Sequence, residues 1–376
     1  MSNSLHPLLG LPIIGSNASS QVEVTDNVSQ RPLPRRPVAI PSMNAAFMMR
    51  TGGTDVIQYG KLPRPVPAPG QVLIKVGAAA VNPIDIEIRS GSLAMPLRFP
   101  YVIGSDVAGT VVMRGIGVRQ FAEGDRVWGS NQGLFGRQGT FAEYVAVDER
   151  WLYPTPRQQS DAEAAAGAMT GIAAGLGLFN AAHLRSSEIV FVHGGAGGIG
   201  SSVLQQAKAA GARVITTAGN SENQAYCREL QADLVLDYRS PKIYDQIREF
   251  AEPFGGIDVW VETQREPELH RTIGLMALGG RIVSLAGHGA NVEVPLNELQ
   301  SANISLLGVS MRTTLPDVQR KCAMALNAGY MQGRWRPRVG MTLSLSQAAA
   351  AQQMQETNVR TPGSTVSGKI IVVPNS

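Results

Sequence analysis

The stretch Glu188-Ile-Val-Phe-Val-His-Gly-Gly-Ala-Gly-Gly-Ile-Gly200 decides the fold. It begins as an apolar run typical of a buried strand, and the segment 201–210 after it has the apolar spacing of a helix. Gly195, Gly197 and Gly200, at the turn between the two, match the pattern G-x-G-x-x-G. Glycine-rich turns occur in many loops, but this one joins a strand to a helix. The setting therefore predicts a dinucleotide-binding unit.

The chemistry of such a turn explains its glycines. Without Cβ atoms the chain turns tightly, its N–H groups approach a pyrophosphate, and the helix packs close to its strand. The helix N-terminus adds partial positive charge for the phosphates. The residues predicted to contact the cofactor here are Gly195, Ala196, Gly197, Gly198, Ile199 and Gly200.

Strand-like and helix-like segments alternate regularly from this turn onward. The strands are expected near 188–193, 213–217, 233–237, 257–262, 281–286 and 304–309. Six strands in this rhythm predict an α/β domain with a doubly wound parallel sheet. Ser221 with Gln224 is interpreted as a capping box at a helix start, and Gly279-Gly280 as the stop of a helix over 266–278.

The end of the second predicted strand bears on which dinucleotide binds. Enzymes that use NAD commonly place Asp or Glu there to bind the ribose 2′-hydroxyl. This chain has Ala218-Gly219-Asn220-Ser221 instead, and the absent carboxylate removes repulsion against a 2′-phosphate. Asn220, Ser221 and Asn223 carry groups that donate hydrogen bonds, while Glu222 is expected to point outward. NADPH is therefore favoured over NADH.

The flanking segments differ from this alternation. From Asn44 to about residue 155, short β-like runs predict a β-rich unit, and the tail from Arg338 to Pro374 returns to such runs. Residues 1–42 are rich in Ser, Asn, Gln and Pro and lack an apolar period, so we expect a disordered extension. A targeting role is the alternative, although the first thirty residues contain no Lys or Arg.

Composition narrows the function classes. The 376 residues carry 33 basic and 29 acidic side chains, a formal net charge of +4, and the basic residues form no dense run interleaved with aromatic ones. Such a balance predicts no nucleic-acid surface. Cys227 and Cys322 make no disulfide framework, are expected as buried or half-buried thiols, and favour a reducing cytoplasmic setting. No apolar run predicts a membrane-spanning helix.

Five motifs then occur in a familiar order: Asn82-Pro-Ile-Asp85, Gly104-Ser-Asp-Val-Ala-Gly109, Gly139-Thr-Phe-Ala-Glu-Tyr-Val145, His193 to Gly200, and Gly368-Lys-Ile370. From about Met43 to the C-terminus the chain resembles the quinone oxidoreductase, or zeta-crystallin-like, branch of the medium-chain dehydrogenases/reductases. The resemblance implies a Rossmann doubly wound parallel sheet inserted into a β-rich GroES-like catalytic domain. The expected parts are an extension over 1–42, the catalytic domain over 43–166, the Rossmann domain over 167–311 and a return over 312–376.

The resemblance also implies a site without zinc. In zinc-dependent relatives a cysteine takes the place of Asn82, and a His-Glu pair takes the place of Ser105-Asp106. The residues themselves agree, because a catalytic zinc needs about three Cys, His or carboxylate ligands. The five histidines are scattered, and the chain has no C-x-x-C or H-E-x-x-H pattern. His193, beside the glycine loop, is read as the end of a buried strand.

By family position, Asn82, Asp85 and Arg89 line the substrate side of the nicotinamide pocket, where hydrogen-bond donors would activate the acceptor. The alternative is that Asn82 belongs to a turn, and that Asp85 and Arg89 form an i, i+4 salt bridge on a helix surface. The expected cofactor contacts are completed by Thr170, Tyr238, Thr263 and Gly287.

Three departures from the family pattern bear on activity. The two tyrosines that surround the substrate in zeta-crystallin-like enzymes are Glu87 and Leu93 here. The usual threonine near the nicotinamide aligns with Ala173, and Thr170, one helical turn away, is a possible substitute. The lysine that usually meets the 2′-phosphate aligns with Asn223.

The sequence thus predicts a zinc-independent oxidoreductase that transfers hydride from NADPH to a small-molecule quinone or α,β-unsaturated carbonyl. One alternative is an enoyl reductase acting on an acyl thioester. Another is a non-catalytic, crystallin-like protein that binds a dinucleotide or associates with RNA. The resemblance further implies a homodimer, and no nucleic-acid or membrane partner is expected.

Overall fold

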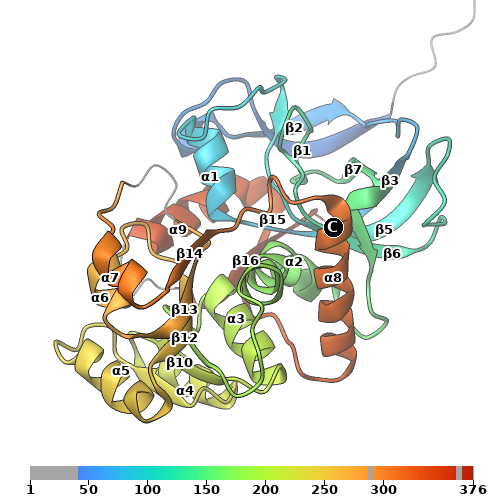
Figure 1. Cartoon of the computed structure of the whole chain (residues 1–376). Coiled ribbons are helices and arrows are strands. Elements are labelled where there is room, and N and C mark those ends of the chain that lie inside the picture. Colours follow the sequence, from blue (N-terminus) through green and yellow to red (C-terminus); the bar gives the residue numbers. More distant parts are fainter. Residues whose placement is uncertain (1–40, 287–290, 361–365, 376) are drawn as a thin grey trace, which may run out of the picture. The chain divides into compact units, whose positions relative to one another are not determined.

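The computed structural model describes residues 41–286, 291–360 and 366–375 (Figure 1). All but two residues of the extension expected over 1–42 lie outside this part. Gly287, one of the predicted cofactor contacts, also lies outside it.

A six-stranded parallel sheet contains the glycine loop. Its strands are β9 (Ile189–Val192), β10 (Arg213–Thr217), β11 (Leu234–Leu236), β12 (Ile257–Glu262), β13 (Met276–Ser284) and β14 (Ser305–Gly308). They lie in the order β11-β10-β9-β12-β13-β14, and each neighbouring pair is parallel. This is the order of the doubly wound dinucleotide fold, which reverses direction beside its first strand, β9. The predicted fold class is confirmed.

Helices connect these strands: α3 (Gly198–Ala209), α4 (Ser221–Glu229), α5 (Ile243–Ala251), α6 (Leu269–Ile273) and α7 (Leu296–Ser301). The predicted start of α4 is wrong by one residue. Asn220 is the N-cap, because its side-chain oxygen accepts a hydrogen bond from Asn223 N at 2.8 Å. Ser221 is therefore the first residue inside the helix.

The helix predicted over 266–278 is also wrong. Only α6 is helical there, and Gly279-Gly280 lies inside β13 instead of ending a helix. Met276 already pairs with Ile257 of β12, so the strand begins before the glycines. Gly279 has a φ of 74°, a left-handed conformation that glycine adopts readily. The glycine therefore marks an irregularity inside the strand and not the end of a helix.

A second sheet is built from both ends of the described chain. Its strands run in the order β15-β16-β3-β5-β6-β8, with β7 also paired to β3, and a smaller sheet has the order β2-β1-β4. The C-terminal strand β16 returns antiparallel to β3, with Ile371 opposite Ala80. The strands are β1 (Ser42–Met48), β2 (Gln58–Pro63), β3 (Gln71–Ala80), β4 (Tyr101–Val102), β5 (Val107–Arg114), β6 (Arg126–Gly129), β7 (Tyr144–Asp148), β8 (Leu152–Pro154), β15 (Val339–Ser344) and β16 (Lys369–Val373).

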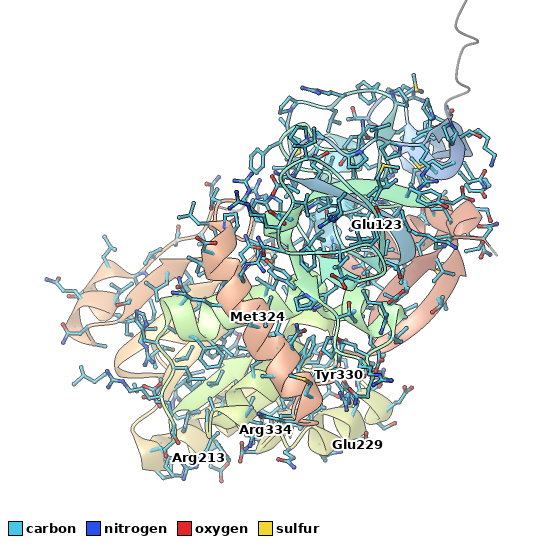
Figure 2. All side chains as sticks on the ribbon, turned by 90° about the vertical axis from the view of Figure 1, so that its right-hand side faces the viewer. Glu123, Arg213, Glu229, Met324, Tyr330 and Arg334 are labelled. Atoms are coloured by element: carbon cyan, nitrogen blue, oxygen red, sulfur yellow. The ribbon has the colours of Figure 1, made fainter. Side chains whose placement is uncertain are left out.

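The remaining helices are α1 (Pro83–Ser90), α2 (Asp161–Gly175), α8 (Pro316–Met331) and α9 (Ala348–Arg360). Ser160 caps α2 in a box with Glu163, and the alanines of α2 let β3, α3 and α8 pack against it. Figure 2 shows α8 along one face, where Met324 is exposed while the Tyr330 hydroxyl reaches Glu163 at 3.2 Å.

One described helical stretch, Asp161–Ala181, is long and apolar enough to span a membrane by length and composition. It consists of α2 and the π-helical turn after it. Its most apolar window is 78% buried inside the protein, in the core that includes Ala78, Trp128 and Leu326. The stretch is therefore accounted for as the central core helix that joins the two sheets.

Candidate functional site

The glycine loop runs from the end of β9 to the start of α3. Gly194 turns the chain with a φ of 64°, and its carbonyl oxygen accepts a hydrogen bond from Gly197 N at 2.8 Å. Gly195 N donates to Thr217 O of β10 at 3.0 Å, which fastens the loop to the neighbouring strand. Gly197 is the N-cap of α3. The first N–H groups of this helix have no acceptor within it, so they are available to an anion.

Two of the motif glycines are required by close approach. A Cβ atom on Gly195 would lie 2.4 Å from Thr216 Oγ1, and one on Gly200 would lie 2.1 Å from Gly194 O. Carbon and oxygen atoms in contact are separated by well over 3 Å, so neither position accepts a side chain without moving the loop. The glycines thus hold the backbone against β10 and against itself.

The residues at the end of β10 lie where the adenosine ribose binds in this fold. Ala218 is buried, and its N–H donates to Leu236 O at 2.8 Å. Gly219 lies against the ring of Tyr238, where a Cβ would be 2.4 Å from Cε1. Asn220 uses its side-chain oxygen to cap α4. These contacts hold the segment in place, and it carries no carboxylate until Glu222, whose side chain is 75% exposed.

Thr170 lies beside the glycine loop. A Cβ on Gly198 would be 2.9 Å from Thr170 Cγ2, and Thr170 Oγ1 donates to Ala166 O within α2. Thr263, which directly follows β12, is partly exposed at the same edge of the sheet as the loop. Both positions are compatible with the cofactor contacts predicted for them, which stay predictions.

A buried polar cluster lies next to this loop, and Lys369 connects the two. A Cβ on Gly198 would lie 3.2 Å from Lys369 Cδ, so the lysine stem packs under the first turn of α3. Lys369 Nζ donates to Val81 O at 2.6 Å and to Asn82 Oδ1 at 2.5 Å. The amide of Asn82 in turn donates from Nδ2 to Asp106 Oδ2 at 2.8 Å. Asn82 therefore bridges an ammonium and a carboxylate.

The hydrogen bonds assign the charges of this cluster. Asp106 accepts from Asn82, from Ser130 Oγ at 2.5 Å and from Met169 N at 3.4 Å. Burial raises the pKa of Asp106, whereas Lys369 and these donors lower it. The Asn82 amide and the Met169 N–H can only donate to Asp106, and the Lys369 ammonium is the cation that favours its charged form, so we assign Asp106 as the carboxylate. Lys369, which contacts only acceptors, is its cation, although burial lowers the lysine pKa.

Asp85 completes the cluster as a buried carboxyl group whose pKa is raised. It is 1% exposed, accepts from Asn82 N at 2.8 Å as part of the capping box of α1, and lies 2.6 Å from Ser105 Oγ. Burial raises its pKa to about 7, an effect that outweighs the Ser105 and Asn82 hydrogen bonds. The nearby charge of Asp106 raises it further. Asp85 therefore holds a proton over a range in which an unfolded chain has lost it.

This titration predicts a pH-dependent stability that Asp85→Asn removes. Between about pH 4 and pH 7 the folded protein binds a proton that the unfolded chain has released, so its free energy of unfolding falls as the pH rises. The total loss is on the order of a few kcal/mol. Asn mimics the protonated acid, so the variant should be the more stable protein at pH 8. Urea unfolding from pH 4 to pH 8 tests this, and parallel profiles for both proteins would contradict it.

The three predicted catalytic residues are all buried. Asn82 is 0% exposed, and its two amide hydrogens face Ala80 O and Asp106, so its role as a donor to substrate stays a prediction that this conformation does not support. The alternative of a surface salt bridge between Asp85 and Arg89 is wrong. Arg89 is 1% exposed and pairs with Glu356 of α9 at 2.8 Å, because α1 and α9 pack together.

Sequence reasoning missed several residues of this site. It noted Ser105-Asp106 only as the place of a metal-ligand pair in relatives, and Gly368-Lys-Ile370 only as a motif. Ser130 was not singled out at all. A lysine in an apolar strand was the available signal for Lys369, since a lysine is buried only when it is paired. His193 is half-buried beside Phe191 and Trp260, and desolvation lowers its pKa to about 4, which fits a strand end.

The cluster does not suit zinc. Among the described residues no group of three or more His, Cys, Asp or Glu side chains is placed to hold a metal ion. At the positions that hold the metal in zinc-dependent relatives, Asn82 and Asp106 are already joined to the Lys369 ammonium and to Ser130. A positive charge at this place opposes a second cation.

Comparison with known proteins agrees with the fold and the loop. A model of the alcohol dehydrogenase GroES-like domain matches residues 68–157, and a model of zinc-binding dehydrogenases matches residues 198–327. The quinone oxidoreductase of Sus scrofa is 32% identical over 332 residues, which cover 88% of this chain and 98% of that protein. A mycobacterial relative solved in complex with NADPH is 27% identical, with a TM-score of 0.77 over 88% of this chain and 100% of that chain.

A further match is to part of a much longer protein. A mycocerosic acid synthase-like polyketide synthase of Mycobacterium tuberculosis is 29% identical over 259 residues, which cover 68% of this chain and 12% of the synthase. The sheet order, the glycine loop and the similarity along nearly the full length of a curated relative lead to one assignment. The chain belongs to the quinone oxidoreductase, or zeta-crystallin-like, branch of the medium-chain dehydrogenases/reductases.

Proposed function

We propose that the chain transfers hydride from NADPH to a quinone or an α,β-unsaturated carbonyl, and that it does so without zinc. The observation that carries the proposal is the glycine loop at the start of α3, which lies directly against the buried Lys369. The loop supplies free N–H groups for a pyrophosphate. NADPH, when bound, supplies the hydride. The quinone oxidoreductases among the relatives, and the neighbour solved with NADPH, support this choice of reaction.

The protein's own contribution is binding, orientation and electrostatics. Gly195 and Gly200 fix the loop, while α2 places Thr170 beside Gly198. Lys369 adds a fixed positive charge beneath the same turn, and a preorganised charge of this kind stabilises negative charge without rearranging. We propose that this internal ammonium takes the electrostatic place that the metal has in zinc-dependent relatives.

The test of the reaction is a substrate panel. Purified protein should bind NADPH, seen as a change in the cofactor's fluorescence, and should oxidise it when quinones or alkenals are added. Activity should be unchanged after incubation with a zinc chelator, and the purified protein should contain far less than one zinc per chain. Failure to bind NADPH would refute the proposal, and loss of activity with the chelator would refute its zinc-free part.

A second candidate function is reduction of an enoyl thioester. The match to a stretch of a polyketide synthase supports it as the second candidate. The chain has Glu87 and Leu93 in place of the two tyrosines that surround the substrate in zeta-crystallin-like enzymes. This difference weakens the case for a quinone as the hydride acceptor. Enoyl thioesters therefore belong in the same panel. A higher kcat/KM on them than on quinones and alkenals would select this second candidate.

We also propose a homodimer that forms along β14. This strand is at the edge of the six-stranded sheet, and unpaired edges invite pairing with another chain. Exposed leucines gather on the elements at this edge: Leu278 on β13, Leu296 on α7 and Leu306 on β14 are 77%, 71% and 43% exposed. Sedimentation of the wild type should report a dimer and that of Leu306→Lys a monomer. A monomeric wild type would contradict the proposal.

A further inference from the structure

A cation reaches the adenosine end of the site from the other sheet. Arg338 directly precedes β15, and its carbonyl oxygen accepts a hydrogen bond from Lys369 N at 2.8 Å. Its side chain extends to α4, where a guanidinium nitrogen lies 2.8 Å from Glu222 Oε1. The other terminal nitrogen lies 3.3 Å from Asn223 Oδ1. The guanidinium therefore lies at the first turn of the helix that follows β10.

Asn223 is the position at which the family resemblance places a lysine for the 2′-phosphate. Its side-chain oxygen accepts hydrogen bonds from Ser367 Oγ at 2.5 Å and from Arg338. Because this oxygen faces two donors, the amide nitrogen on the same carbon faces the opposite way. Arg338 thus brings a positive charge against the Asn223 side chain, at the position where the resemblance places a lysine.

The two members of the Arg338–Glu222 ion pair differ in freedom. The Arg338 side chain is 21% exposed, and its guanidinium lies 4.4 Å from the centre of the Tyr226 ring, a cation–π contact that holds it in place. The Glu222 side chain is 75% exposed. An exposed ion pair is worth little, so the carboxylate leaves readily while the guanidinium stays.

A second arginine lies at the same segment. Arg239 donates to the carbonyl oxygen of Gly219 and pairs with Asp237, which neutralises that acid. Two guanidinium groups therefore contact the residues 219–223 that follow β10, and the only acid within this segment is Glu222. The charges of the segment favour an anion once Glu222 moves aside.

We infer that Arg338 is the residue that selects NADPH over NADH by binding the 2′-phosphate, and that Glu222 is its counter-ion in the cofactor-free protein. The inference rests on the proposed use of NADPH and names the residue that determines it. A phosphate binds a guanidinium through two parallel charge-assisted hydrogen bonds, so it displaces a single exposed carboxylate. Arg338 acts from the sheet formed by β15 and β16, and NADPH thereby contacts both sheets.

The test measures dissociation constants of both nucleotides on the full chain. Arg338→Gln should raise the Kd of NADPH about 10- to 100-fold and leave that of NADH within about twofold. Glu222→Gln should lower the Kd of NADPH about two- to fivefold, because it removes both the competitor and a repelling charge. A residue that merely holds the two sheets together would affect both nucleotides in the same direction.

Two further variants separate charge from packing. Arg338→Lys retains the positive charge and should recover part of the NADPH affinity, while Arg334→Gln, on a nearby exposed arginine, should change neither Kd. The inference is overturned if Arg338→Gln weakens NADPH and NADH alike, or if Glu222→Gln weakens NADPH. In both cases the proposed reaction still stands. If the wild type binds neither nucleotide, the proposed function and this inference fail together.

Discussion

Gly200→Ala should abolish dinucleotide binding, with a Kd for NADPH at least about 100-fold above that of the wild type. The new Cβ would lie 2.1 Å from Gly194 O and 2.7 Å from Gly194 C, both backbone atoms of the same loop. No rotamer relieves such a contact, so the loop and the start of α3 must separate. Gly195 would move with them, and the N–H groups would lose their common direction toward the pyrophosphate.

Two other glycine-to-alanine variants serve as comparisons for the loss of NADPH affinity. Gly197→Ala brings a Cβ to 3.2 Å from Gly194 O, a contact that a small shift relieves, and should weaken binding less than Gly200→Ala. Gly274→Ala, in the same sheet domain, meets nothing closer than 3.7 Å and should bind like the wild type. Nucleotide titration of the three variants measures the order. Tight NADPH binding by Gly200→Ala would show that the loop is not the cofactor site.

Lys369→Met should destabilise the protein by about 3–5 kcal/mol, because it leaves Asp106 as a buried charge without its cation. Asp106 is 0% exposed and cannot recover the lost interaction from water. Asn82 would also lose the ammonium on its oxygen while still donating to the carboxylate. The free energy of unfolding in urea measures the loss.

The double variant Lys369→Met with Asp106→Asn isolates the cause. It removes both charges, so most of the lost stability should return, as neutral replacement of buried ion pairs generally permits. Lys75→Met on the exposed face of β3 is the control and should change stability by less than about 0.5 kcal/mol. If the double variant is as unstable as the single one, the cluster is held by packing of the lysine stem and the charge assignment is wrong.

The six-stranded sheet and its glycine loop were predictable because their signals are local. The apolar strand, the turn and the helix of 188–210 are consecutive, and each carries its own pattern. The helix expected over 266–278 failed for a related reason. A pair of glycines such as Gly279-Gly280 is found both after the end of a helix and at irregular points in a strand. Only the pairing of β13 with β12 shows that the strand forms here.

The polar cluster was not predictable because its contacts are distant in sequence. Lys369 and Asn82 are 287 residues apart, and Arg338 and Asn223 are 115 residues apart. No periodicity links such positions, and a lysine at the start of an apolar strand does not reveal which residues it contacts. The salt bridge expected between Asp85 and Arg89 was wrong for the opposite reason, because their i, i+4 spacing is a local signal that suggests a pair. In the structure α1 packs on α9, and Arg89 pairs with Glu356 instead.

The pairing of β16 with β3 sets an order of assembly. The six-stranded sheet is made of consecutive residues, so it can form while the rest of the chain is still being synthesised. The sheet beside Asn82 cannot close until β16 brings Lys369, and until then Asp106 lacks its cation. Closing that long loop is the costly, non-local step of folding. The arrival of β16 therefore decides when the sheet that begins with β3 becomes complete.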